Sequence, residues 1–250
     1  MILYAAPAPA AGGDWDLRVR VRPAAVEMGT RFTGADVEVS GFVRPGSKVA
    51  VVIRGENRTE TFYRKARAGP IWITSGKVQV SGVPTLFLRF TDGMLRNFLA
   101  RDAIDHFQMD QSAIQRQLEI HPDHDHETMV AGWLSLKAHD GTYGLVRDGV
   151  RMGQPGPAGV PFTVAFRWPR KAAPAEYYVN VYECRDNAVA GSASLKLPVV
   201  RVGFPAWLSA LAKQRSLLYG ALATLVAAAA GFGIDFLVAL VFGRGAVAAR

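Results

Sequence analysis

A long apolar segment near the C-terminus restricts the architecture of this chain more than any other feature. Residues 217–242 read LLYGALATLVAAAAGFGIDFLVALVF, and Asp235 is the only charged residue among them. At a rise of ~1.5 Å per residue, a helix of this length exceeds the ~30 Å apolar thickness of a bilayer. Helices buried in soluble proteins are seldom this long or this free of charge. The segment therefore predicts a single transmembrane helix, with a short tail at 243–250, and makes a lipid bilayer the first expected partner.

The residues before this segment predict a short helix at the membrane surface. The stretch 203–216 opens with Gly-Phe-Pro, and Pro205 suits the first turn of a helix. Phe204 and Trp207 fall on one side of such a helix, whereas Lys213 and Arg215 carry charge near its end. Aromatic and basic residues in this arrangement are typical of the membrane–water interface.

Small residues at a spacing of four define one face of the predicted span. Ala223, Ala227 and Gly231 allow close approach of another helix, and Asp235 continues the same face. An intramembrane carboxylate usually faces protein or water. Two interpretations stay open. The face docks a partner membrane protein, or the apolar core ends near Ile234 and Asp235 lies in the interface.

The orientation of the span does not follow from charge, because basic residues flank it on both sides. Residues 1–13, MILYAAPAPAAGG, resemble the end of a signal peptide without its basic start. We interpret them as a signal-peptide remnant. The expected location is the cytoplasmic (inner) membrane, with one span and a body, residues 14–202, on the periplasmic side.

The body is predicted to be mainly β, because short alternating segments recur between turn signals rich in Gly and Pro. The expected strands are 15–22, 36–43, 48–54, 59–63, 71–74, 78–80 with a continuation into 84–90, 161–168, 177–184 and 193–200. Strands at this spacing suggest an immunoglobulin-like β-sandwich. Cys184 is the only cysteine, so the disulfide of antibody domains is excluded, and we expect this thiol to be a small packing residue. Near-helical apolar spacing over 93–138 predicts a helical insertion.

Several segments together resemble a family of transmembrane proteins first grouped from alphaproteobacteria. The matching pieces, in the family's order, are RFTGA at 31–35 followed by Val37 and Gly41, VVIRG at 51–55, Arg64-Lys65 followed by GPIWI at 69–73, SGVP at 81–84, YYVNVYECRD at 177–186, and VGF at 202–204 leading to LYG at 218–220. The resemblance implies an exported domain with a C-terminal anchor. Because members are thought to be encoded beside permeases of the sulfite-exporter type, it also implies an accessory role and such a permease as partner. It implies no catalytic residue.

The densest polar cluster is the stretch 121–127, HPDHDHE. His121, His124 and His126 among carboxylates are a candidate Zn²⁺ or Cu²⁺ site, although their spacing matches no standard ligand pattern. The alternative is a solvated helix start after Pro122, where acidic residues are favourable. A metal-binding protein or metal-dependent hydrolase is therefore the second functional hypothesis.

A second candidate site lies among the middle strands. Arg64, Lys65 and Trp72 combine cationic and aromatic side chains, which suits an anionic ligand or a lipid phosphate. The alternative is a charged edge strand that discourages aggregation.

The overall charge of +8 is scattered, without a nucleic-acid motif, so anionic lipid is the expected partner rather than nucleic acid. The chain contains no G-x-S-x-G, Walker A, H-E-x-x-H or paired-cysteine signature. We therefore expect a non-enzymatic binding or accessory protein without a cofactor. A purely structural envelope protein is a third hypothesis.

Overall fold

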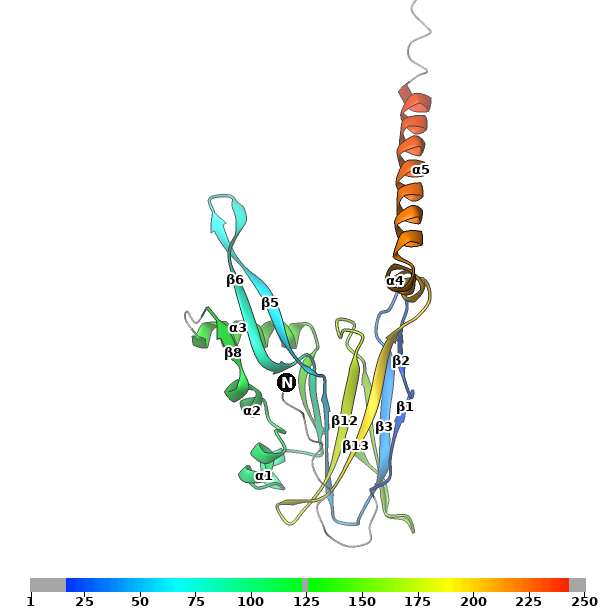
Figure 1. Cartoon of the computed structure of the whole chain (residues 1–250). Coiled ribbons are helices and arrows are strands. Elements are labelled where there is room, and N and C mark those ends of the chain that lie inside the picture. The colour runs from blue at the N-terminus through cyan, green and yellow to red at the C-terminus, as the bar shows by residue number, and fades with distance from the viewer. Residues whose placement is uncertain (1–16, 123–125, 243–250) are drawn as a thin grey trace, which may run out of the picture. The chain divides into compact units, whose positions relative to one another are not determined.

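The structure, a computed structural model, describes residues 17–122 and 126–242 (Figure 1). Within these ranges it leaves undescribed the side chains of Arg64, Ala66, Trp72, Ser75, Pro205 and residues 239–242. The chain separates into two compact units: Met1–Val200, called the body below, and Arg201–Arg250, called the anchor unit.

The body is built on two sheets that share one core. The first sheet has the order β1-β3-β11-β10, and its strands are β1 (Val19–Arg22), β3 (Asp36–Val43), β10 (Arg151–Met152) and β11 (Val160–Arg167). The second has the order β2-β13-β12-β4-β7-β9, and its strands are β2 (Val26–Met28), β4 (Lys48–Arg54), β7 (Phe87–Thr91), β9 (Tyr143–Arg147), β12 (Glu176–Arg185) and β13 (Ala188–Arg201). Val39 and Phe162 of the first sheet and Val51 and Val181 of the second are buried in one cluster. The two sheets therefore form a β-sandwich.

A third layer covers the other face of the six-stranded sheet. It consists of β5 (Asn57–Ala68), β6 (Ile71–Pro84), β8 (Glu119–His121), the 3-10 helix η1 (Leu95–Asn97), α1 (Arg101–His106), α2 (Gln111–Gln117) and α3 (His126–His139). Val52, Phe87 and Tyr182 of the sheet join Ile114 and Trp133 of this layer in a second apolar cluster. Because both faces of the sheet are covered, every residue of β4 after Lys48 is buried.

This architecture confirms the expected fold class, since the chain is mainly β with several sheets and one C-terminal apolar helix. The predicted helical stretch contains η1, α1, α2 and most of α3, interrupted by the short strand β8. The immunoglobulin-like assignment stays a prediction.

The middle strands differ from the sequence expectation. Residues 57–84 form one long antiparallel hairpin, β5–β6, that turns at Gly69-Pro70, rather than several short strands (Figure 1). The strand expected to run on into 84–90 is divided, since β6 ends at Pro84 and β7 begins at Phe87 in another sheet. Residues 55–56 and 85–86 connect the six-stranded sheet to the hairpin, and two backbone hydrogen bonds hold them together. Gly55 N–H donates to Leu86 O at 3.0 Å, and Thr85 N–H donates to Glu56 O at 3.0 Å.

The anchor unit contains two helices, α4 (Phe204–Gln214) and α5 (Ser216–Phe242). Gly203, with a φ of +71°, precedes α4 in a conformation that favours glycine, and Pro205 lies in the first turn. The stretch Ser216–Val238 of α5 is long and apolar enough to cross a bilayer, and all its side chains are exposed within the described residues. An apolar helix of this length is stable against lipid rather than water.

Candidate functional site

The outer half of the β5–β6 hairpin, residues 63–77, contains the residues that the sequence predicts to form an anion site. Arg64 pairs with Gly76, Lys65 with Thr74, and Arg67 with Trp72 in the antiparallel register. The structure thus places the backbones of Arg64, Lys65 and Trp72 within the last few pairs before the turn. The Lys65 side chain is exposed, whereas those of Arg64 and Trp72 lie outside the described residues.

This outer half exposes apolar side chains as well as basic ones. Tyr63 is 64% exposed, Ile71 60% and Ile73 45%. Every described side chain from 63 to 77 is exposed. The strand β8 pairs with β6 only at Gln79–Ser81, so the third strand of this sheet does not extend to the outer half.

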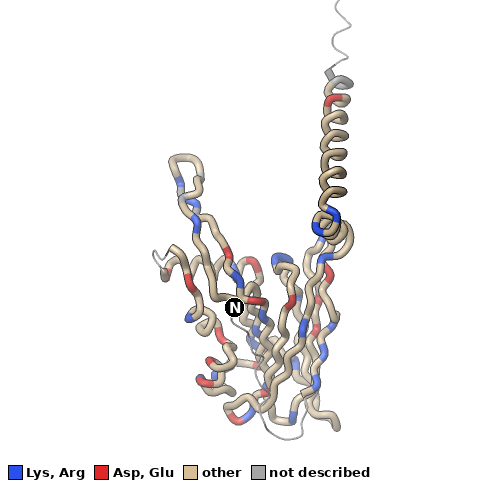
Figure 2. The backbone as a smooth tube through the Cα atoms, viewed as in Figure 1, with Lys and Arg blue, Asp and Glu red and all other residues tan. Residues whose placement is uncertain are grey.

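The hairpin is strongly basic. Residues 57–84 contain five Lys and Arg residues and one carboxylate, Glu60. Glu60 lies at the base of the hairpin and accepts a hydrogen bond from Lys137 of α3 at 2.7 Å. Figure 2 shows the positions of Lys and Arg in blue along the backbone tube. The one negative charge is therefore compensated within the body, whereas the described basic side chains of the hairpin are exposed.

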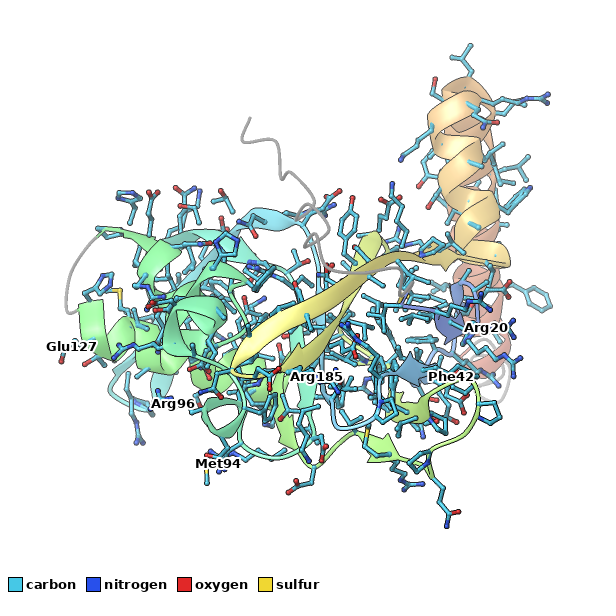
Figure 3. The ribbon with its side chains drawn as sticks, turned by 90° about the horizontal axis from the view of Figure 1, so that it is seen from below. Arg20, Phe42, Met94, Arg96, Glu127 and Arg185 are labelled. Carbon is cyan, nitrogen blue, oxygen red and sulfur yellow. The ribbon has the colours of Figure 1, made fainter. Side chains whose placement is uncertain are left out.

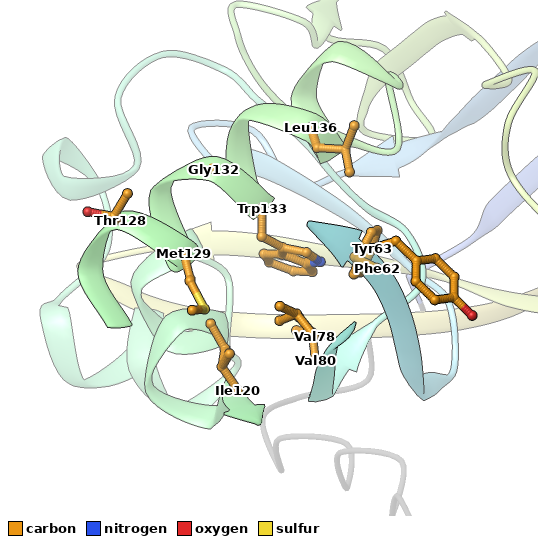
Figure 4. A pocket seen from close by; sticks show the side chains of 10 residues that line it. All are labelled: Phe62, Tyr63, Val78, Val80, Ile120, Thr128, Met129, Gly132, Trp133 and Leu136. Atoms are coloured by element: carbon orange, nitrogen blue, oxygen red, sulfur yellow. The ribbon is translucent and has the colours of Figure 1, made fainter. Parts of the chain in front are cut away.

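An apolar groove separates the base of the hairpin from α3 (Figure 4). It has a volume of about 440 Å³ and is lined by Phe62, Tyr63, Val78, Val80, Ile120, Thr128, Met129, Gly132, Trp133 and Leu136. The Trp133 ring is buried, and its Nε1–H has no acceptor among the described residues. The groove therefore has mainly apolar walls. The groove could not be predicted from the sequence, because β5 and α3 are far apart in the chain. The apolar side of the helical stretch was the one sequence signal that an apolar surface lies here.

The histidine cluster lies partly beyond the structure. His121 ends β8 and His126 begins α3, and both side chains are exposed. His124 lies outside the described residues. Among residues 17–122 and 126–242, no group of three His, Cys, Asp or Glu side chains is arranged to hold a metal ion. The metal site stays a prediction.

Cys184 has the environment expected of a packing residue. Its side chain is 1% exposed and belongs to the second apolar cluster. Burial is the largest effect on the thiol and raises its pKa to about 12, so the reactive thiolate is scarce at neutral pH.

The small-residue face of α5 is open along its length. Ala223, Ala227, Gly231 and Asp235 are all exposed, and each step of four turns the position by only about 40° around the axis. Asp235 forms no hydrogen bond or ion pair with another described residue. Its carboxylate therefore receives no compensation from the described part of the chain.

The comparison with known families agrees with this architecture. A family described as "Putative transmembrane protein (Alph_Pro_TM)" matches residues 16–239, which include the body from residue 16 onward and nearly all of α5. No curated protein and no solved structure matches the chain. Because the match covers far more than half of the sequence, the chain belongs to this family of transmembrane proteins.

Proposed function

We propose that the chain is a non-enzymatic accessory protein that presents its β body on the periplasmic side of the cytoplasmic membrane and docks a partner membrane protein through α5. The observation that carries the proposal is Asp235, an uncompensated carboxylate on an exposed face of small residues. A charged residue at the centre of a span costs about 2.5–3.5 kcal/mol on insertion scales, and the cost is smaller toward the end of the span, where Asp235 lies. A partner helix that offers a hydrogen-bond donor offsets this cost, and Gly231 allows its backbone to approach closely.

The family resemblance supplies the class of partner. A permease of the sulfite-exporter type is a polytopic membrane protein, so its helices offer surfaces on which a single span can pack. The histidine cluster, with His121 and His126 both exposed, provides no observation that favours a metal-dependent function over this one.

Substitutions on the α5 face test the docking proposal. We expect Gly231→Leu combined with Asp235→Leu to reduce the permease recovered with the chain on the order of tenfold, equivalent to ~1.4 kcal/mol of binding free energy. The measurement is crosslinking in membranes, purification in mild detergent and identification of partners by mass spectrometry. Ala229→Leu combined with Gly233→Leu is the matched control, since each position lies about 200° around the axis from Ala227 or Gly231. Equal recovery of the permease with the wild-type chain, the 231/235 variant and the 229/233 control contradicts the proposal.

The periplasmic orientation has its own test. A fluorescent protein fused after Arg250 is expected to fluoresce, and alkaline phosphatase at the same point is expected to be inactive, because both report a cytoplasmic C-terminus. The same reporters inserted in the turn at Gly69-Pro70 should give the opposite results. An active phosphatase after Arg250 would defeat this orientation.

A further inference from the structure

Beyond Tyr63, which borders the groove beside α3, no described side chain in the outer half of the β5–β6 hairpin is buried against the rest of the body. All its described side chains are exposed, and β8 does not reach it. An isolated two-stranded hairpin is at best marginally stable in water. Exposed Ile71 and Ile73 add apolar area next to the turn, and Tyr63 adds more nearer the base. Contact with an external surface would bury this apolar area and stabilise the outer half of the hairpin.

The side chains of the outer half select the chemistry of that surface. Lys65 and Arg67 are exposed on the face of the hairpin opposite Ile71 and Ile73, because they pair with Thr74 and Trp72, so the two faces near the turn differ in chemistry. Lys77 follows on β6. Within the described part of the chain, neither Lys65 nor Lys77 forms an ion pair. Aromatic, aliphatic and basic side chains together suit a bilayer interface, where apolar groups enter the headgroup boundary and cations meet lipid phosphate.

The register of the six-stranded sheet determines the end of the sheet at which the hairpin begins. Arg54 of β4, Tyr178 of β12 and Lys196 of β13 lie in one row, and both β4 and β13 are antiparallel to β12. The two strands therefore run in the same direction. β4 leads into the hairpin at the end of the sheet where β13 leads into the anchor unit.

The hairpin is also long enough to reach beyond that end. Gly69 follows Arg54 by 15 residues, whereas Arg201 follows Lys196 by 5. At about 3.3 Å per residue in extended chain, these lengths are roughly 50 Å and roughly 17 Å. The span begins a short distance along the sequence, at Ser216.

We propose that the outer half of the β5–β6 hairpin, residues 63–77, binds the anionic headgroup surface of the bilayer in which α5 is anchored. The body then has two attachments to the membrane, one covalent through α5 and one electrostatic and interfacial through the hairpin. This contact requires lipid alone, so it stands or falls independently of a permease partner.

The test measures lipid contact in the full chain. Ile71→Cys is labelled with an environment-sensitive fluorophore and reconstituted into nanodiscs of phosphatidylcholine, with or without phosphatidylglycerol, that carry a headgroup quencher. The native Cys184 is buried with a raised thiol pKa, so it stays unlabelled at neutral pH. Met94→Cys is the reference site. It follows β7, which is antiparallel to β4, and so lies at the opposite end of the sheet (Figure 3).

The expected result is strong quenching at position 71 in anionic nanodiscs, weak quenching there in neutral ones, and little at position 94 in either. Each basic residue near an anionic surface is worth about fivefold in binding, so Lys65→Gln with Arg67→Gln should weaken the contact by roughly 30-fold. Arg96→Gln with Arg101→Gln removes the same charge and should change nothing. Both lie near Ala100, whose N–H donates to Asn187 O at the end of the sheet opposite the hairpin.

Three results would overturn the proposal. Quenching at position 71 no greater than at 94 in anionic nanodiscs excludes the contact. An equal loss of quenching in the Lys65/Arg67 variant and in the Arg96/Arg101 variant shows that the net charge of the body, and not the hairpin, is responsible. Crosslinking between hairpins of two chains without lipid quenching assigns the surface to self-association. Unchanged thermal unfolding of each variant verifies that the body is folded, and Ile73→Cys provides a second label site.

Discussion

Replacing Glu183 with alanine is expected to lower the free energy of unfolding of the body by about 3 kcal/mol, because the change leaves a charged partner uncompensated. The Glu183 side chain is 0% exposed and accepts hydrogen bonds from Arg44 N at 2.9 Å, Arg44 Nε at 3.0 Å, Arg44 Nη2 at 3.1 Å and Ser47 Oγ at 2.7 Å. These bonds fasten the β3–β4 turn to β12. The Arg44 side chain is 24% exposed, so water recovers part of its solvation and the loss falls at the lower end of the range for buried pairs.

The Glu183 carboxylate also makes the free energy of unfolding depend on pH, and the direction of its pKa shift gives the sign. Burial acts to raise the pKa of Glu183, but the hydrogen bonds from Arg44 and Ser47 outweigh it, and the pKa is lowered from 4.5. A lowered carboxyl pKa contributes stability above the unfolded pKa, and that contribution is lost as pH falls through the folded pKa. The difference between wild type and Glu183→Gln should therefore be full at neutral pH and shrink below about pH 4.5.

Urea unfolding of the full chain in mild detergent, followed by tryptophan fluorescence from neutral pH downward, measures both effects. Glu38→Gln removes a carboxylate from the exposed side of β3 and serves as the control. It should leave the transition midpoint near that of wild type. A midpoint for Glu183→Ala equal to that of the control would mean that the Arg44 network does not stabilise the sandwich.

Two arginines in the middle of α5 are expected to abolish membrane insertion. Leu225 and Phe232 are exposed, and each lies about 100° or more around the axis from Ala223, Ala227 and Gly231. Each arginine at the centre of a span costs about 2.5–3.5 kcal/mol, so Leu225→Arg with Phe232→Arg should cost about 5–7 kcal/mol and leave almost no inserted chain. Translation into microsomes, with glycosylation acceptor sites on each side of α5, measures the inserted fraction. Leu225→Ile with Phe232→Leu should insert as wild type does, and equal insertion of the arginine variant would contradict a span at α5.

The features that could be predicted from the sequence are those encoded in local patterns. The alternation of 15–22 corresponds to β1, and the apolar runs at 48–54 and 217–242 correspond to β4 and α5. The pair Asp186-Asn187 between β12 and β13, in which both residues have positive φ, is a local hairpin signal of the same kind. Each of these signals depends on neighbouring residues, so no knowledge of the partner strand was needed.

The features that were missed depend on contacts between distant segments. The parallel pairing of β7 with β9 joins strands separated by the helical stretch, and nothing in 143–147 identifies its partner. The role of Glu183 depends on the turn at Arg44 and on a register shift between Glu183 and Cys184 that changes the strand's alternation. The single long hairpin was divided in the prediction, because its outer residues are exposed on both faces and lack a period of two in polarity.

The candidate sites follow the same rule. Arg64, Lys65 and Trp72 were selected as one cluster from their closeness in sequence, and the hairpin register brings their backbones together. The groove beside α3 requires Phe62 and Trp133 to meet, which only the tertiary fold specifies. The face of α5 was readable because a helix converts a spacing of four into one side.

Alkaline extraction of membranes tests the anchoring by α5 most directly. After a carbonate wash without detergent and high-speed centrifugation, the intact chain should stay in the pellet, while a chain that ends at Arg215 should pass into the supernatant. Recovery of the unclipped full-length chain in the supernatant would contradict a membrane-spanning α5 and, with it, the proposals on docking and on the hairpin.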